Sequence, residues 1–121
     1  MRIHVLAATL LAALLLPVAA LADMAGAYSV AGANFDGSAY AGTVVVTATS
    51  DTTYSVVWTT GQDQVSQGIG MSDGHAFAAA YVLNEAAGLA IYEVHQDGSL
   101  EGHWTVAGQN GIGAETWTPK R

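Results

Sequence analysis

The sequence lacks cysteine altogether, has two prolines, and carries only three lysine and arginine residues against ten aspartates and glutamates. Without cysteine the chain has no disulfide staples, so a small fold must be held by its core and its hydrogen bonds. The scarcity of basic residues excludes nucleic acid as a partner, because a chain of formal net charge −7 repels it. Low proline and a charged fraction of 11% favour an ordered domain.

The first 22 residues have the organisation of a secretory signal peptide. Arg2 supplies the charged n-region, an apolar run follows as far as Ala22, and Ala20-Leu21-Ala22 matches the A-x-A cleavage rule. An uncleaved membrane anchor is the alternative interpretation of the same run. We predict cleavage between Ala22 and Asp23, which exports residues 23–121 to the periplasm or the extracellular medium as one small domain without a membrane span.

Beyond residue 22, β-favouring runs alternate with turn clusters, and no stretch has a convincing amphipathic period of 3.6 residues. This rhythm is typical of an all-β sandwich or barrel. The sequence predicts eight strands near residues 26–33, 39–49, 53–60, 64–71, 75–82, 88–95, 99–107 and 111–118. A helix is the alternative only for the alanine-rich residues 76–89, and there the alternation of Phe77 and Tyr81 favours a strand.

The short connections predict that each strand pairs antiparallel with the next one. Eight strands in such a meander close most economically on themselves, because closure removes the exposed edges. The expected fold class is therefore all-β, an eight-stranded antiparallel meander closed as a small up-and-down β-barrel. A barrel of this size holds packed side chains or one small ligand.

Alternation along each strand predicts which side chains point into the barrel. The expected inward set is Tyr28, Val30, Tyr40, Val44, Val46, Tyr54, Val56, Trp58, Val65, Ile69, Met71, Phe77, Tyr81, Leu100, Trp104 and Val106. The opposite positions hold mostly threonine, serine and charged residues, so they are expected to face water.

Two stretches repeat one phrase, DGSAYAGTV at Asp36–Val44 and DGSLEGHW at Asp97–Trp104. Asp-Gly between alternating runs is a strong hairpin signal. A glycine flanked by large inward residues, such as Gly42 or Gly102, marks a bend or a close approach of two chains. We interpret the repetition as hairpin architecture and not as a repeated binding element.

The hairpin over residues 88–107 has two possible registers. A two-residue turn at Asp97-Gly98 points Glu93 into the barrel over Gly102, whereas a three-residue loop at 96–98 places Tyr92 over Gly102 and turns Glu93 to solvent. We favour the second register slightly. In the last strand, Glu115 shares a face with Trp117 and follows it inward if the indole is buried.

An inward carboxylate needs hydrogen-bond donors or serves a ligand, because burying it unpaired costs several kcal/mol. An enclosed aromatic face with few polar groups is typical of barrels that bind small molecules. The predicted ligand-binding residues are Tyr28, Tyr54, Trp58, Phe77, Tyr81, Tyr92 and Trp104, with Glu93 or Glu115 as the polar anchor.

The groups that catalysis needs are sparse. Beyond residue 22 no lysine precedes Lys120, and no known nucleophile motif is present. His75, His95 and His103 are interpreted as surface residues, since a zinc or copper site needs at least three converging ligands. We therefore expect a protein that is not an enzyme and that uses no metal and no cofactor.

The stretch YSVAGANFDGSAYAGTVVVT (Tyr28–Thr47) resembles the opening hairpin of avidin-like barrels, in which a strand, an x-Asp-Gly turn and an x-Gly-x-aromatic strand recur. The motifs G-x-Y-x-V-x-G-x-N, D-G-S-x-Y-x-G-T-V, G-L-A-x-Y-E and D-G-x-L-x-G-x-W resemble a group of small exported bacterial proteins of unknown function, some of them labelled fibronectin-binding. The biotin contacts of avidin do not map onto this chain. The leading hypothesis is binding of a small apolar or aromatic ligand, and the alternative is recognition of an extracellular or envelope protein.

Overall fold

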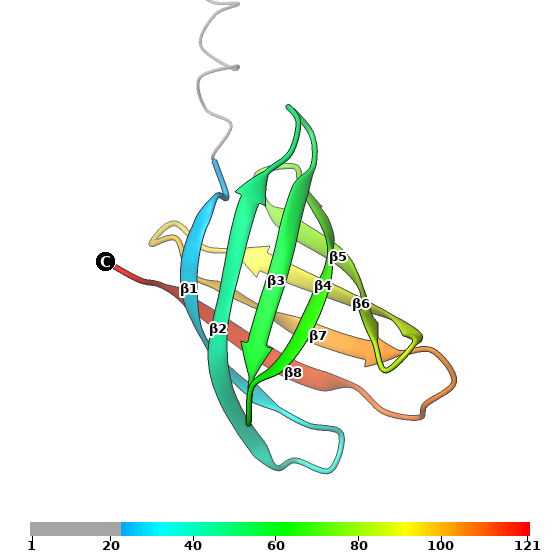
Figure 1. Cartoon of the computed structure of the whole chain (residues 1–121). Coiled ribbons are helices and arrows are strands. Elements are labelled where there is room, and N and C mark those ends of the chain that lie inside the picture. The colour runs from blue at the N-terminus through cyan, green and yellow to red at the C-terminus, as the bar shows by residue number, and fades with distance from the viewer. Residues whose placement is uncertain (1–22) are drawn as a thin grey trace, which may run out of the picture.

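The computed structural model describes residues 23–121, and the predicted signal peptide at 1–22 lies outside them. The described chain forms a closed antiparallel barrel in which every strand pairs with the next and the last pairs with the first (Figure 1). The strands are β1 (Gly26–Ala33), β2 (Ala39–Ala48), β3 (Tyr54–Thr60), β4 (Gln64–Ser72), β5 (Ala76–Leu83), β6 (Ala86–Val94), β7 (Leu100–Val106) and β8 (Gly113–Pro119). The predicted fold class and its eight strands are confirmed, including the strand over the alanine-rich segment.

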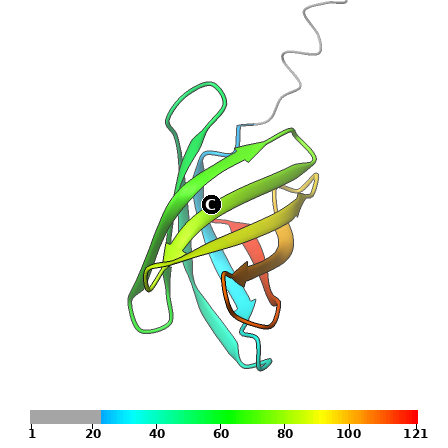
Figure 2. The same cartoon turned by 90° about the vertical axis from the view of Figure 1, so that its right-hand side faces the viewer.

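The connections alternate between the two ends of the barrel, as both views show (Figure 1; Figure 2). We call one end the closed end. It carries residues 23–25, 49–53, 73–75, 95–99 and 120–121. We call the other end the open end. It carries residues 34–38, 61–63, 84–85 and 107–112. Within the described residues, no helix has the length and apolar character needed to cross a membrane.

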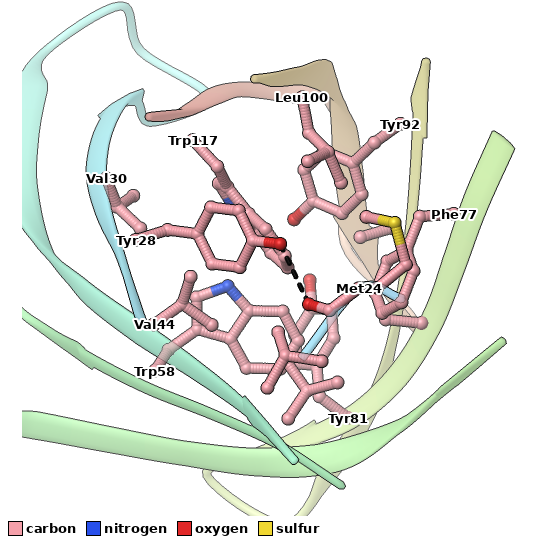
Figure 3. Close-up of a cluster of buried hydrophobic side chains, with 14 of the residues drawn as sticks. Met24, Tyr28, Val30, Val44, Trp58, Phe77, Tyr81, Tyr92, Leu100 and Trp117 are labelled. Atoms are coloured by element: carbon pink, nitrogen blue, oxygen red, sulfur yellow. Dashed lines mark hydrogen bonds between the residues drawn. The ribbon is translucent and has the colours of Figure 1, made fainter. Parts of the chain in front are cut away.

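The interior of the closed end is filled by side chains (Figure 3). Phe77 and Trp117 are fully buried, and Met24 is buried among the neighbouring aromatic rings. The Tyr28 hydroxyl donates a hydrogen bond of 2.8 Å to the Met24 carbonyl oxygen, and the Met24 amide donates one of 3.3 Å to the Tyr54 hydroxyl. The residues just before β1 thus seal this end of the barrel.

The two Asp-Gly-Ser stretches form the same turn at opposite ends of the barrel. Asp36 Oδ1 accepts hydrogen bonds from the Ser38 amide and hydroxyl at 2.9 and 2.6 Å. Asp97 Oδ1 accepts the same pair from Ser99 at 2.9 and 2.7 Å. The intervening glycine has a φ of 87° in the first turn and 88° in the second, which glycine adopts at little cost. The repeated stretches are therefore hairpin turns, which confirms the interpretation made from the sequence.

Strand β4 contradicts the inward prediction. Val65, Ile69 and Met71 have exposed fractions of 55%, 65% and 59%, so they lie on the outer face. The inward positions of β4 belong to small residues such as Gly70, whose missing side chain leaves space for the ring of Phe77 from β5. The alternation rule assigned the larger side chains to the core, but bulky residues of neighbouring strands fill that volume instead.

Ile69 and Met71 belong to an exposed apolar strip that runs across the outer faces of β4, β5 and β6. We define the apolar strip as Ile69, Met71, Val82, Leu89 and Ile91, each more than half exposed. A shallow groove of about 610 Å³ follows part of it on the outside of the barrel. The strip therefore belongs to the protein surface and not to the barrel interior.

Candidate functional site

The hairpin between β6 and β7 adopts the register with the longer loop. Tyr92 lies opposite Gly102, and the His95 amide closes the loop by donating to the Ser99 carbonyl oxygen at 2.9 Å. Glu93 faces outward, with 74% of its side chain exposed. The two-residue turn is therefore wrong, and Glu93 is not the polar anchor, because the adopted register keeps its charge in water.

Glu115 is the carboxylate that the barrel encloses, and it turns inward together with the fully buried Trp117. Only 7% of Glu115 is exposed. Four neutral donors surround it: the Tyr40 hydroxyl at 2.5 Å from Oε2, and the Tyr92 hydroxyl, Trp117 Nε1 and Trp58 Nε1 at 2.8, 2.8 and 3.3 Å from Oε1. These four hydrogen bonds compensate the burial of the carboxylate without any basic residue.

Two tyrosines reach Glu115 from opposite sides, each across a glycine. In the pairing of β8 with its neighbours, Glu115 lies opposite Gly32 of β1 and Gly102 of β7. Gly32 in turn pairs with Tyr40 of β2, and Gly102 pairs with Tyr92 of β6. A Cβ on Gly32 would overlap the Tyr40 ring, and a Cβ on Gly102 would meet the Ile91 carbonyl oxygen and the edge of the Tyr92 ring, so both positions need glycine. The pairing of neighbouring strands therefore brings both tyrosine hydroxyls to the Glu115 carboxylate.

A cavity of about 240 Å³ lies between this cluster and the open end. Its lining combines aromatic walls, a carboxylate and a polar mouth: Tyr40, Trp58, Tyr81, Tyr92, Trp104, Glu115, Asn34, Thr60, Gly61, Gln64, Ser66 and Leu83. The closed end is packed and the open end is hollow, so the cavity is a pocket that ends at the carboxylate and not a channel through the barrel.

The same aromatic-over-glycine arrangement sets two further walls of the cavity. Tyr81 of β5 lies opposite Gly88 of β6, and Trp104 of β7 lies opposite Gly113 of β8. A Cβ on either glycine would overlap the facing ring. The Tyr81 hydroxyl also donates a hydrogen bond of 2.9 Å to the Thr105 carbonyl oxygen. These contacts hold both rings along the sheet and leave the middle of the cavity free.

Trp104 presents a buried donor without an acceptor. Its Nε1 makes no hydrogen bond, and it is the one side-chain nitrogen or oxygen so buried and unpaired among the described residues. The Trp104 indole lies close to the Tyr40 hydroxyl and acts to lower the Tyr40 pKa, against the effects of burial and of Glu115. The two groups nevertheless do not form a hydrogen bond, so Nε1 stays unpaired. Buried donors are nearly always paired in native proteins, so Trp104 Nε1 is an exception among the buried polar groups of the described barrel.

The tyrosines around the cavity are held in their protonated form. Burial, and then the nearby Glu115 charge, raise the pKa of Tyr81 to about 12. The same two causes, burial first, raise the pKa of Tyr40 and Tyr92 well above the ordinary value for tyrosine. All three hydroxyls therefore keep their protons at neutral pH and donate the hydrogen bonds described above.

The predicted site residues divide into three groups. Trp58, Tyr81, Tyr92, Trp104 and Glu115 meet at the cavity. Tyr28, Tyr54 and Phe77 belong to the packing of the closed end, where Tyr54 and Phe77 have ring centroids 5.9 Å apart. Glu93 lies outside the barrel. The sequence prediction thus named more aromatic residues than the cavity uses, because alternation identifies the inward face but not the depth along the barrel axis.

Tyr40 and Trp117 complete the Glu115 cluster, and sequence reasoning did not assign either of them to the site. Tyr40 was expected to point inward, and its position opposite Gly32 in the first hairpin is a readable sign that its ring lies across the neighbouring strand. Its contact with Glu115 was not readable, because that contact depends on the pairing of β1 with β8.

The three histidines in the described part of the chain do not line the cavity. His95 Nε2 lies 3.8 Å from carboxylate oxygens of both Glu93 and Glu101, on the outside of the β6–β7 hairpin. His75 and His103 are exposed. Within residues 23–121 no group of three or more histidine, aspartate or glutamate side chains is arranged to hold a metal ion.

No protein-family model matches the chain, and a search of curated proteins gives no match. Three solved structures share the barrel. A redesigned β-barrel, mFAP1, bound to DFHBI has a TM-score of 0.65 at 13% identity, over 80% of this chain and 94% of that one. A de novo designed fluorescence-activating β-barrel has a TM-score of 0.57 at 14% identity, over 79% and 93%. A mutant of the fluorescent protein UnaG has 0.52 at 10%, over 80% and 96%. The likeness extends to the fold alone.

Proposed function

We propose that this protein binds a small apolar or aromatic molecule inside the barrel, without catalysing a reaction. The observation that carries the proposal is the half-filled interior: one end is packed, and the other holds a cavity of about 240 Å³ that is lined by aromatic rings and ends at Glu115. Concave, mostly aromatic sites with a few converging polar groups are typical of small-molecule binding. The mFAP1 barrel, described as bound to DFHBI, supports the capacity of this architecture to hold a small ligand.

The arrangement of Glu115 favours binding over catalysis. Its Oε1 accepts three hydrogen bonds, which stabilise the carboxylate and occupy that oxygen. A general base has to reach the proton that it abstracts, and it usually acts beside a nucleophile or an orienting partner. The described residues that line the cavity include no histidine, lysine or arginine to serve as such a partner.

The proposal is tested by following the indole N–H signals of the three tryptophans by NMR while a panel of small aromatic compounds is added. We expect saturable shifts of the Trp104 signal, and loss of binding in a Trp104→Ala variant. Leu89→Ala, on the outer apolar strip, is the matched control and should bind normally. A panel that leaves all three indole signals unchanged would overturn the proposal.

We further propose that the domain is exported after cleavage at Ala22. The described fold supports this position, because Met24 is already part of the sealed end and only Asp23 lies between it and the predicted cut. N-terminal sequencing of the protein recovered from the periplasm or the medium should begin at Asp23. Recovery in the cell with residue 1 retained would contradict export.

Recognition of an extracellular or envelope protein is the second candidate function, and the apolar strip is the observation that favours it. Contiguous exposed apolar side chains are uncommon on monomeric proteins and often mark contact surfaces. Ile69→Lys combined with Leu89→Lys should abolish binding to immobilised fibronectin or other matrix proteins if this candidate is right. Absence of binding by the unmodified protein would remove it.

A further inference from the structure

The open end of the barrel carries acidic residues and no basic ones, whereas the closed end carries both kinds. The open-end loops carry three exposed acidic residues and no basic residue: Asp36, Asp63 and Glu85. The basic and histidine residues of the described chain lie elsewhere: His75, His95, Lys120 and Arg121 at the closed end, and His103 on the outer face of β7. The mouth of the cavity therefore has a negative potential, which raises the local concentration of cations and lowers that of anions.

The floor of the cavity carries the same sign of charge. Glu115 is the only buried charged residue among the described residues, and each of its four partners is a neutral donor. Neutral donors stabilise a carboxylate but leave its net charge in place, and a charge in a poorly solvated site acts over a longer distance than one in water. Oε2 accepts a single hydrogen bond, from Tyr40, and so keeps room for another donor.

The walls between floor and mouth are faces and edges of aromatic rings. Trp58 and Tyr81 lie with their centroids 5.3 Å apart, and Tyr40 and Trp104 lie 6.3 Å apart. Tryptophan and tyrosine faces attract cations through the ring quadrupole, most strongly where water is excluded. A carboxylate floor, aromatic walls and an acidic mouth thus form three independent features that all favour a positive ligand.

We propose that the ligand of this cavity is a small organic ammonium ion, a protonated or quaternary amine on an apolar body. This inference rests on the proposed function and specifies the ligand class. The ammonium group lies on the Oε2 side of Glu115, and the apolar body lies against Trp58 and Tyr81. Anionic aromatic molecules are excluded by the mouth and by the floor.

Three probes of nearly equal size separate charge from shape: benzylammonium, benzyl alcohol and benzoate. Their affinities are measured by calorimetry and by the tryptophan indole signals, at low and at high salt. We expect benzylammonium to bind at least about tenfold more tightly than benzyl alcohol, and benzoate to bind most weakly. Higher salt should weaken benzylammonium binding and leave benzyl alcohol unchanged, because salt screens the acidic mouth.

Two sets of variants locate the source of the preference. Glu115→Gln keeps the shape and one acceptor oxygen, and it should remove most of the preference for benzylammonium. Glu93→Gln removes one charge outside the barrel and should keep the preference. If Glu115→Gln does not fold, the double variant Asp63→Asn with Glu85→Gln replaces it. That variant should weaken benzylammonium binding about twofold or more at low salt only.

The outcomes distinguish this inference from the function on which it rests. Equal or tighter binding of benzyl alcohol, with the cavity indoles shifted, overturns the ammonium ligand and keeps small-molecule binding. Loss of the preference in Glu93→Gln as well overturns the role of Glu115. No indole shift with any of the three probes overturns ligand binding in the cavity itself.

Discussion

The closed end and the open end of the barrel are built with the same device and reach opposite results. At the closed end the Phe77 ring lies over Gly70, and at the open end the Trp104 ring lies over Gly113. Phe77 is fully buried because Met24 and the neighbouring rings cover it, whereas Trp104 remains partly exposed at the cavity. The difference shows that an aromatic ring over a glycine sets the direction of a side chain, while the residues beyond it decide whether the space is filled.

The largest effect expected from this difference is on stability. Phe77→Ala should lower the free energy of unfolding by about 3–5 kcal/mol, since the fully enclosed site cannot collapse around the lost ring. Trp104→Ala should cost only about 1–2 kcal/mol, because its ring already borders open space. Urea denaturation followed by circular dichroism measures both. Equal losses would show that the two ends are packed alike.

The next effect concerns the carboxylate that separates the two ends. Glu115→Leu leaves four buried donors without an acceptor and should destabilise the fold by about 3 kcal/mol or more. Glu115→Gln keeps an acceptor oxygen and should cost less. Glu93→Leu, on the outer face, is the matched control and should stay within about 0.5 kcal/mol of the unmodified protein. A loss for Glu93→Leu as large as for Glu115→Leu would contradict the cluster.

A smaller effect comes from filling the glycine sites themselves. Gly70→Ala should cost about 1–3 kcal/mol, since the added methyl group meets the Phe77 ring in a packed region. Gly113→Ala should cost less, because the Trp104 ring can tilt into the cavity, and it should change ligand binding more than stability. Denaturation and the indole titration together measure the contrast. The reverse order of stabilities would contradict it.

The smallest effect is a dependence of stability on alkaline pH. Tyrosine titrates near pH 10 in the unfolded chain, and the pKa of Tyr81 is raised to about 12 by burial and by the Glu115 charge. The unfolded state therefore releases its tyrosine proton first, so the contribution of Tyr81 to stability is constant below about pH 10 and falls as the pH rises towards about 12. Denaturant midpoints measured across this range should fall, and they should fall less in a Tyr81→Phe variant. A flat profile would contradict the shift.

How much of the fold could be predicted is clear from particular strands. Turn residues and alternation located all eight strands, and they settled the inward direction of residues such as Val44 and Trp58. They failed on β4, where Ile69 and Met71 are apolar and yet point outward. Side-chain hydrophobicity alone cannot show that the core volume beside a strand is already taken by rings from its neighbour.

The candidate site shows the same division. The sequence narrowed the polar anchor to Glu93 or Glu115, and it coupled Glu115 to the direction of Trp117. The choice between them required the register of the β6–β7 hairpin, in which a one-residue slip would exchange Tyr92 and Glu93. The sequence did not place Tyr40 beside Glu115, although both residues are visible in it.

The sequence by itself determined the secondary structure, the antiparallel order of the strands and the acidic character of the chain, because these depend on local turn chemistry and composition. Only the tertiary structure decided where the barrel is filled and where it is hollow. Tyr40 and Glu115 lie far apart in the chain and meet only because β1 pairs with β8. Closure of the barrel is a long-range event, and it brings Tyr40, Tyr92 and Glu115 together across Gly32 and Gly102.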